Sequence, residues 1–113
     1  MEQTSTSINR VPDFVARHRS ALESLCREFH VARLELFGSA VTDRFDIGRS
    51  DLDFLMEFEA GFEPELKLDA YMGFKEQLER LFDRNVDILF LSAVRNPFVR
   101  TEIDRQRTPI YAL

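Results

Sequence analysis

Three aspartates occupy positions in the sequence where a charge is costly. Asp51 and Asp53 flank one leucine in "SDLDFL", and strand alternation would place both carboxylates on the same face of a sheet. Asp87 is the only polar residue of the run "VDILFL", and we expect a strand this apolar to be covered on both faces. Neighbouring like charges repel each other, and burying an unpaired charge is expensive. A divalent cation bound among the carboxylates would remove both penalties.

This pattern of carboxylates suits one kind of chemistry, the transfer of phosphoryl or nucleotidyl groups. Mg²⁺ is usually held by one or two carboxylates together with the phosphates of a substrate. Carboxylates around one or two metal ions can clamp a triphosphate and activate an attacking hydroxyl. If the strands of Asp53 and Asp87 are neighbours, the third carboxylate lies beside the first two. We therefore expect Asp51, Asp53 and Asp87 to be both catalytic residues and metal ligands.

A possible phosphate site precedes the first two aspartates. Gly38 and Ser39 follow the apolar run of residues 31–37, and a short helix is expected after them. A glycine lets a phosphate approach the backbone closely, and the start of a helix offers unpaired N–H groups to an anion. Ser39 adds a hydroxyl and could cap that helix. Arg44 and Arg49, in the loop that follows, complete the predicted nucleotide-binding set.

Each of these motifs has an ordinary structural explanation when it is taken alone. Gly38 and Ser39 could form a simple turn between a strand and a helix. Asp51 and Asp53 could be the solvated start of a strand, and Asp87 could pair with an arginine of the core. The joint spacing of the three motifs favours the functional interpretation over three separate coincidences.

Other residues that often do chemistry are predicted to stay outside the site. His18 and His30 are twelve positions apart and have no other ligand types near them, so neither is expected to bind zinc or to catalyse. Cys26, the only cysteine, belongs to an apolar helical stripe and is expected in the core. A lone cysteine also fits a reducing compartment, and we expect the protein in the cytoplasm.

Composition limits the possible partners. The 113 residues fit one domain, and the hydrophobic content of 44% supports a folded core. The net charge of −5 argues against a broad grip on the backbone of DNA or RNA. No apolar run approaches the roughly 20 residues that cross a bilayer, and the polar start of the chain is not typical of a signal peptide. We expect neither broad nucleic-acid binding nor membrane insertion.

The chain is predicted to form one α/β domain from residue 11 to 113, after a flexible tail of residues 1–10. Strands are expected at residues 31–37, 51–58 and 86–91, because these segments are apolar or alternate. Helical spacing covers residues 12–29, 65–82 and 97–105, although Gly73 costs about 1 kcal/mol in the second of these helices. Residues 110–113 are a tail that packs or pairs. Strands that alternate with helices indicate a layered α/β fold.

At these motifs the sequence resembles the minimal nucleotidyltransferases of the DNA polymerase beta-like superfamily. The pattern is Gly-Ser, a loop, Asp-x-Asp on a strand and a later third Asp, seen here in "FGSAVTDRFDIGRSDLDFLMEF" and "VDILFL". The segments "FKEQLERLFDRNVDILFLSAV" and "TEIDRQRTPIYA" extend the likeness to about residues 29–112. It implies the polymerase beta-like fold, a small mixed sheet with flanking helices. It also implies that Gly38 and Ser39 bind the phosphates of ATP, and that Asp51, Asp53 and Asp87 hold Mg²⁺.

Two departures from the family pattern concern the edges of the site. Many members have Arg-Gly where this chain has Thr42-Asp43, so a phosphate-binding arginine is either missing or replaced by Arg44. Asp83 stands where a glycine is common before the third strand, which affects the turn and not the chemistry. Neither departure touches the core motif.

The resemblance also implies a biological role. Free-standing members of this size usually act as the antitoxin of a small helical HEPN-type ribonuclease toxin, forming a hetero-oligomer with it and transferring AMP from ATP to one of its tyrosines. A short domain without an acceptor-binding unit agrees with an acceptor that docks from outside. Two alternatives remain open, an antitoxin that only binds its toxin and a nucleotidyltransferase that modifies a small molecule. The sequence leaves open the acceptor, the preferred nucleotide and the stoichiometry.

Overall fold

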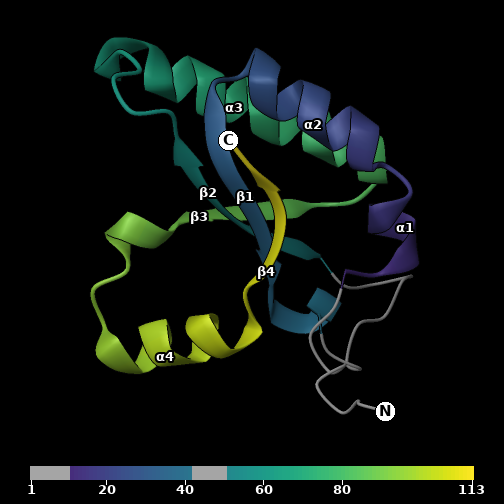
Figure 1. Ribbon diagram of the computed structural model, residues 1–113, viewed down its shortest axis with the longest axis vertical. Coiled ribbons are helices and arrows are strands. Elements are labelled where there is room, and N and C mark those ends of the chain that lie inside the picture. The colour runs from purple at the N-terminus through teal and green to yellow at the C-terminus, as the bar shows by residue number, and fades with distance from the viewer. Residues whose placement is uncertain (1–10, 42–50) are drawn as a thin grey trace.

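The computed structural model describes residues 11–41 and 51–113, which form a sheet between two layers of helix (Figure 1). Within these residues the sheet has four strands in the order β3-β2-β1-β4. The elements are α1 Asp13–Ala16, α2 Arg19–Glu28, β1 Val31–Phe37, the 3₁₀ turn η2 Gly38–Val41, β2 Leu52–Phe58, α3 Pro64–Phe82, β3 Val86–Phe90, the 3₁₀ turn η3 Leu91–Ala93, α4 Pro97–Gln106 and β4 Thr108–Ala112.

The sheet is mixed, as the resemblance implied. β1 pairs antiparallel with β2 and with β4, whereas β2 and β3 run parallel. A parallel pair needs a long crossover connection, and α3 supplies it. Residues 110–112 of the predicted tail belong to β4, and the Arg19 guanidinium also ties the strand to α2 by donating to the carbonyl oxygen of Ile110 at 3.0 Å. None of the described helices is long and apolar enough to cross a membrane.

One face of the sheet carries the main hydrophobic core, under α2 and α3. Alternation along β1 and β2 directs every second side chain to this face, where the helices contribute an apolar stripe. Cys26 is buried here, as predicted, and burial raises the pKa of its thiol to about 12. The fully buried residues of this core include Leu22, Cys26, Leu34, Leu36, Phe54, Phe74 and Leu78.

Gly73 allows α3 to approach α2. A Cβ atom at this position would lie 2.8 Å from Cε1 of Phe29, which is closer than side chains tolerate. The Phe29 ring also packs against Phe74, with ring centroids 5.9 Å apart. The contact between helix and ring therefore offsets the propensity cost that the glycine brings to the helix.

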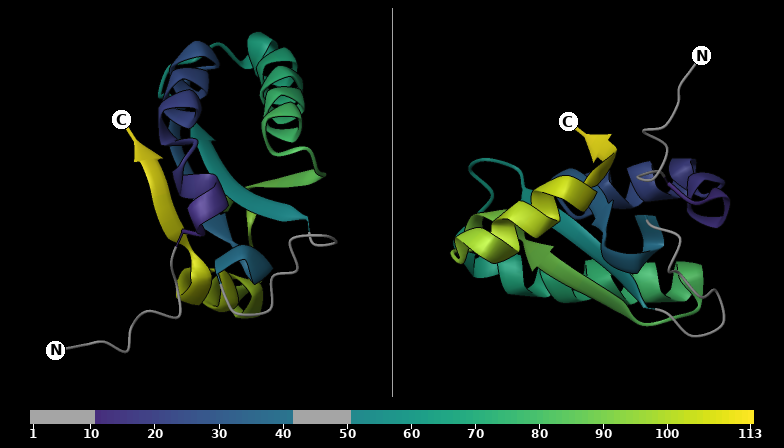
Figure 2. Two further views of the ribbon diagram at one scale, coloured as in Figure 1. Left: turned by 90° about the vertical axis from the view of Figure 1, so that its right-hand side faces the viewer. Right: turned by 90° about the horizontal axis from the view of Figure 1, so that it is seen from below.

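The opposite face of the sheet is covered by α4, as Figure 2 shows. A smaller cluster of Leu55, Leu91 and Ile103 joins β2 and η3 to this helix. Phe37 and Leu89 pack against the cluster from β1 and β3. Asp53 and Asp87 lie on the same face, because Asp53 is two residues from Leu55 along β2 and Asp87 is two residues from Leu89 along β3.

Two expectations about elements were wrong. The helical pattern of residues 12–29 is broken by a turn at Arg17 and His18, which lets His18 and Phe14 both meet the ring of Phe82 edge-on. β3 was expected to be covered on both faces, but it is an edge strand and Asp87 is exposed. Asp83 ends α3 in the left-handed conformation with φ of 52°, so this turn forms without a glycine.

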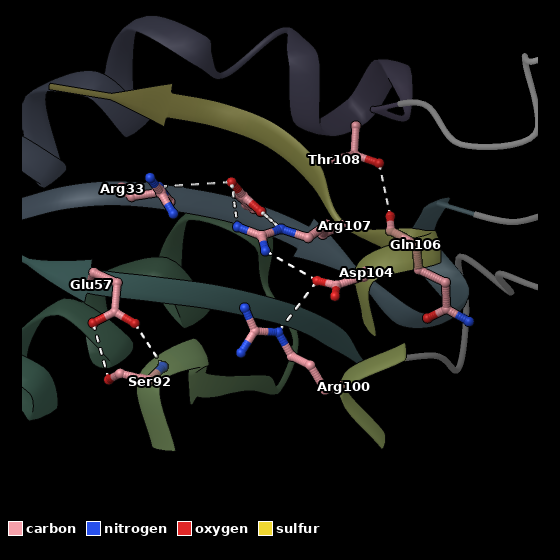
Figure 3. A network of polar contacts seen from close by, with 9 residues as sticks. Arg33, Glu57, Ser92, Arg100, Asp104, Gln106, Arg107 and Thr108 are labelled. Carbon is pink, nitrogen blue, oxygen red and sulfur yellow. Dashed lines mark hydrogen bonds and ion pairs between the residues drawn. The ribbon is translucent and has the colours of Figure 1, made fainter. Parts of the chain in front are cut away.

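A buried ion pair fixes the corner between α4 and β4. Glu35, in the middle of β1, accepts two hydrogen bonds from the Arg107 guanidinium, at 2.7 Å from Nε and 3.3 Å from Nη2. Figure 3 shows the same guanidinium reaching Asp104, which also receives the side chain of Arg100. The Glu35 side chain is only 8% exposed and that of Arg107 only 22%. The pair therefore holds the end of α4 against β1.

We expect Arg107→Met to lower the free energy of unfolding by about 2–3 kcal/mol, because it leaves the buried Glu35 carboxylate with only the half-exposed Arg33 guanidinium, at 4.0 Å, as a partner. The partial exposure of Arg107 keeps this loss below that of a fully buried pair. The double variant Glu35→Met/Arg107→Met should recover most of the stability, since no unpaired charge remains. Urea unfolding followed by circular dichroism measures both effects. Additive losses in the double variant would contradict the proposed coupling.

Candidate active site

The parallel pairing of β2 and β3 places two of the predicted carboxylates side by side. Asp53 is directly opposite Asp87 in the register, and Phe37 is opposite Asp53 on the other side. The backbone N–H of Leu52, the first residue of β2, donates to the carbonyl oxygen of Asn85 at 3.2 Å, so the contact extends to the residue before β3. The condition set by the sequence, that the two strands be neighbours, is met.

The electrostatics of Asp53 reflect this crowding. The pKa of its carboxyl group is raised from 3.8 to about 6, mainly by burial and in addition by the negative charges of Asp87 and Asp51. A hydrogen bond with the Asp87 side chain adds to the shift and requires a proton between the two groups. Above pH 6 the proton is lost and two adjacent negative charges remain. Such a site favours a cation.

Asp51 stands at the margin of this pair. It precedes β2 by one residue and is exposed, although its charge acts on Asp53. Among the described residues, no group of three or more histidine, cysteine, aspartate or glutamate side chains is arranged to hold a metal ion. The donor chemistry of Asp53 and Asp87 nevertheless fits Mg²⁺, which prefers hard oxygen ligands and commonly takes only one or two carboxylates from the protein.

Gly38 lies against Asp53, and this contact requires a glycine at position 38. Its φ of 77° is in the left-handed region, and a Cβ atom here would be 2.4 Å from Oδ2 of Asp53. Only glycine therefore fits between the end of β1 and Asp53. The 3₁₀ turn η2 begins at Gly38, so residue 39 lies inside the turn and not at the capping position before it. The Ser39 side chain, like Arg44 and Arg49, lies outside the described residues.

Two further residues support the site, and the sequence analysis missed both. The Oε1 atom of Gln106 accepts a hydrogen bond from the Gly38 N–H at 3.0 Å. The Oε2 atom of Glu79 accepts from the Val86 N–H at 3.1 Å and from Lys75 at 3.1 Å, which anchors β3 one residue before Asp87. These bonds lower the pKa of Glu79, the backbone N–H more than the lysine. Lys75 and Glu79 have the i,i+4 spacing of a helical ion pair, but no local pattern could indicate the bond between Gly38 and Gln106, which are 68 residues apart.

An apolar hollow of about 440 Å³ adjoins the site on the α4 face. Two of its walls are neighbours of the carboxylates along the sheet, because Phe37 pairs with Asp53 and Leu89 is two residues beyond Asp87. The helix supplies the rest of the wall, including the highly exposed Phe98. The hollow is lined by Phe37, Leu89, Phe98, Val99, Glu102, Ile103 and Gln106.

The described residues form a mixed sheet with a glycine turn after β1, an aspartate on β2 and a second aspartate on the parallel neighbour of β2. This is the arrangement that the resemblance to polymerase beta-like nucleotidyltransferases implied. The nucleotidyltransferase domain family matches residues 18–110, which include all of these positions. The chain belongs to this family.

Known relatives agree with this assignment. A Methanocaldococcus jannaschii protein provisionally named a protein adenylyltransferase is 24% identical over 98 residues, which cover 87% of this chain and 92% of that protein. A solved structure provisionally described as a minimal nucleotidyltransferase is 30% identical, with a TM-score of 0.67 and coverage of 88% of this chain and 96% of that one. A complex of tri-AMPylated Shewanella oneidensis HEPN toxin with MNT antitoxin matches at a TM-score of 0.57 and 16% identity, over 86% of this chain and 71% of that one. The last likeness shows the fold alone.

The contact between Gly38 and Asp53 predicts a specific stability effect. Gly38→Ala should lose the roughly 1–2 kcal/mol that a left-handed conformation costs an alanine, and an additional amount from the clash with Asp53. Gly61→Ala is the matched control, because Gly61 has φ of 84° and nothing within 4 Å of its Cβ position. Urea unfolding should show the larger loss for Gly38→Ala, and an Asp53→Ala background should reduce the excess. Equal losses at the two glycines would rule out the clash.

The raised pKa of Asp53 predicts a pH-dependent gain in stability for Asp53→Asn. Between its ordinary value of 3.8 and about 6, the folded chain keeps a proton that the unfolded chain has released. Wild-type stability therefore decreases as pH rises through this window, and the penalty is fully present above it. In EDTA, Asp53→Asn should melt higher than wild type at about pH 8 and close to wild type at about pH 4. A gain independent of pH would contradict the assigned cause.

Proposed function

We propose that this chain transfers AMP from ATP to a hydroxyl group of a partner protein. The observation that carries the proposal is the pair Asp53 and Asp87, held side by side by the strand register next to the Gly38 turn. In the reaction the acceptor oxygen bonds to the α-phosphorus of ATP, the bond to pyrophosphate breaks and pyrophosphate leaves. The hydroxyl proton passes to a nearby carboxylate or to water.

Mg²⁺ is the metal that this site would bind, with Asp53 and Asp87 as its protein ligands and Asp51 as the third carboxylate. When bound, it would neutralise charge on the triphosphate and on the attacking oxygen. The chain's own contribution is to hold the two carboxylates at the fixed spacing of neighbouring strands. Because the chain has a net charge of −5, a cation is also needed to bring an anionic nucleotide to this acidic site.

The triphosphate is assigned to the turn after β1. Gly38 leaves the backbone open there, and backbone N–H groups at such a turn can donate to phosphate oxygens. Ser39, Arg44 and Arg49 complete the proposed nucleotide-binding set, as hydroxyl and guanidinium donors to phosphate. ATP is the proposed donor because two relatives are described in terms of adenylyl transfer.

The proposed acceptor is a HEPN-type ribonuclease toxin, modified on a tyrosine, and the chain is its antitoxin. The support comes from the Shewanella oneidensis complex, in which the HEPN toxin carries AMP groups and is bound to an MNT antitoxin of the same fold. The archaeal relative, provisionally named a protein adenylyltransferase, points to the same class of acceptor. On this basis the chain forms a hetero-oligomer with its toxin.

Incubation of the full chain with its toxin, ATP and Mg²⁺ should raise the intact mass of the toxin by one or more AMP groups. EDTA should abolish the mass increase and weaken ATP binding in calorimetry, because the carboxylates then repel the phosphates. Asp53→Asn should bind the toxin and fold normally, yet leave its mass unchanged. Asp13→Asn, which replaces an exposed carboxylate on α1, is the control and should keep full transfer.

The same experiment separates transfer from simple binding. If Asp53→Asn protects cells from the toxin as well as wild type does, neutralisation occurs by binding alone. If wild type leaves the toxin unmodified but adenylylates a small hydroxylated molecule, the acceptor class is wrong. ATP affinity that is unchanged in EDTA would refute the metal role of the aspartates.

A further inference from the structure

The backbone N–H of Gly38 is bound by a side chain from the far end of the described chain. β1 ends at Phe37, which pairs with Asp53, so the Gly38 N–H lies one residue beyond the last pair of the ladder. The Oε1 atom of Gln106 accepts this N–H at 3.0 Å, across 68 residues of sequence. Gln106 is the last residue of α4 and also lines the apolar hollow. This bond therefore ties α4 to the turn after β1.

The position of Gly38 matters because it is in contact with a proposed metal ligand. Glycine has no side chain of its own to hold it, and it has more conformational freedom than any other residue. The vacant Cβ position of Gly38 is 2.4 Å from Oδ2 of Asp53, so a small rotation of this turn changes the surroundings of the carboxylate. A tether on Gly38 thus acts on both the phosphate turn and Asp53.

Gln106 is well placed to serve as that tether because its own backbone is fixed. The next residue, Arg107, is bound to the buried Glu35, and its backbone N–H donates to the carbonyl oxygen of Ile103 at 2.8 Å. The hydroxyl of Thr108 donates to the carbonyl oxygen of Gln106 at 2.9 Å, as Figure 3 shows. Only the torsions of the Gln106 side chain are left to order when its bond to Gly38 forms.

The chemistry of the amide fits the site better than that of a carboxylate. A glutamate would also accept the Gly38 N–H, but it would add another negative charge close to Asp53 and to the phosphates. A methionine would fill the same space without a strong acceptor. Glutamine is a neutral residue that combines the required length with a strong acceptor.

We propose that Gln106 is a positioning residue that holds the Gly38 turn in the conformation that receives the triphosphate. It acts through Gly38 and touches none of the reacting atoms. This inference rests on the proposed function, because it assigns the triphosphate to this turn. It adds a residue that belongs to neither the Gly-Ser motif nor the aspartates.

The first test compares Gln106→Met with wild type by two independent measurements. Hydrogen exchange of the Gly38 amide, followed by NMR, should become faster because its acceptor is gone. With Mg²⁺, the KM for ATP and the Kd from calorimetry should rise about 3- to 10-fold, the effect of one hydrogen bond, while kcat changes little. Wild-type protection of the Gly38 amide together with wild-type affinity would overturn the proposal.

Two further variants separate positioning from general effects on α4. Gln106→Glu keeps the acceptor, so the Gly38 amide should stay protected while the added charge still raises the KM for ATP. Loss of protection in this variant too would overturn the acceptor role. Glu102→Gln changes another residue of the hollow, one turn earlier on α4, and should leave both measurements at wild-type values. If it reproduces the effects of Gln106→Met, the positioning role is wrong.

ATP binding by the wild-type chain separates this inference from the proposed function. A wild-type chain that binds no ATP with Mg²⁺ would refute the proposed function, and the positioning role with it. Protection of the Gly38 amide by Gln106 would then be a structural bond only. A wild-type chain that binds ATP, with Gln106→Met binding equally well, would refute the positioning role alone.

Discussion

The parallel register of β2 and β3 is the constraint on which the rest of the site depends. It puts Asp53 directly beside Asp87, and neither strand can shift by one residue without turning its side chains to the other face. The price of this juxtaposition is visible in the raised pKa of Asp53. The pair persists because the opposite face of the same strands is buried in the main core, where a slip in register would expose apolar side chains such as Phe54.

The neighbourhood of the pair is arranged to accommodate the two charges. β3 is an edge strand, so Asp87 remains exposed to water and the cost of desolvation is borne mainly by Asp53. On the other side of Asp53, glycine at position 38 provides the space that its carboxylate occupies. Glu79 holds the N–H of Val86, which fixes the start of β3 beside β2. Together, the exposure of Asp87, the space at Gly38 and the anchored start of β3 allow the two carboxylates to stay adjacent.

The local features of this structure could be predicted from sequence, and the long-range ones could not. The strand pattern predicted the bounds of β1, and period-two alternation placed Asp53 on the face of β2 opposite Leu52 and Phe54. The parallel pairing of β2 with β3 then places Asp87 beside Asp53. The Glu35–Arg107 ion pair and the Gln106 bond to Gly38 join residues about 70 positions apart, and neither has a local signature. The apolar run of β3 was misread as fully covered because composition does not distinguish an edge strand that packs on one face from a central one.

The long-range contacts connect the two faces of the molecule to the same turn. The main core fixes β1 and β2 from one side, whereas α4 reaches the end of β1 from the other side through Gln106 and through the anchored Arg107. Gln106 donates no group to the reaction, but it is hydrogen-bonded to Gly38, and its neighbour Arg107 is fixed by Glu35. In a domain of this size, only one layer of helix lies between the outer surface of α4 and the sheet that carries the carboxylates. Contacts made on α4, which presents the exposed Phe98, are consequently separated from the carboxylate pair by a single helix and one glycine turn.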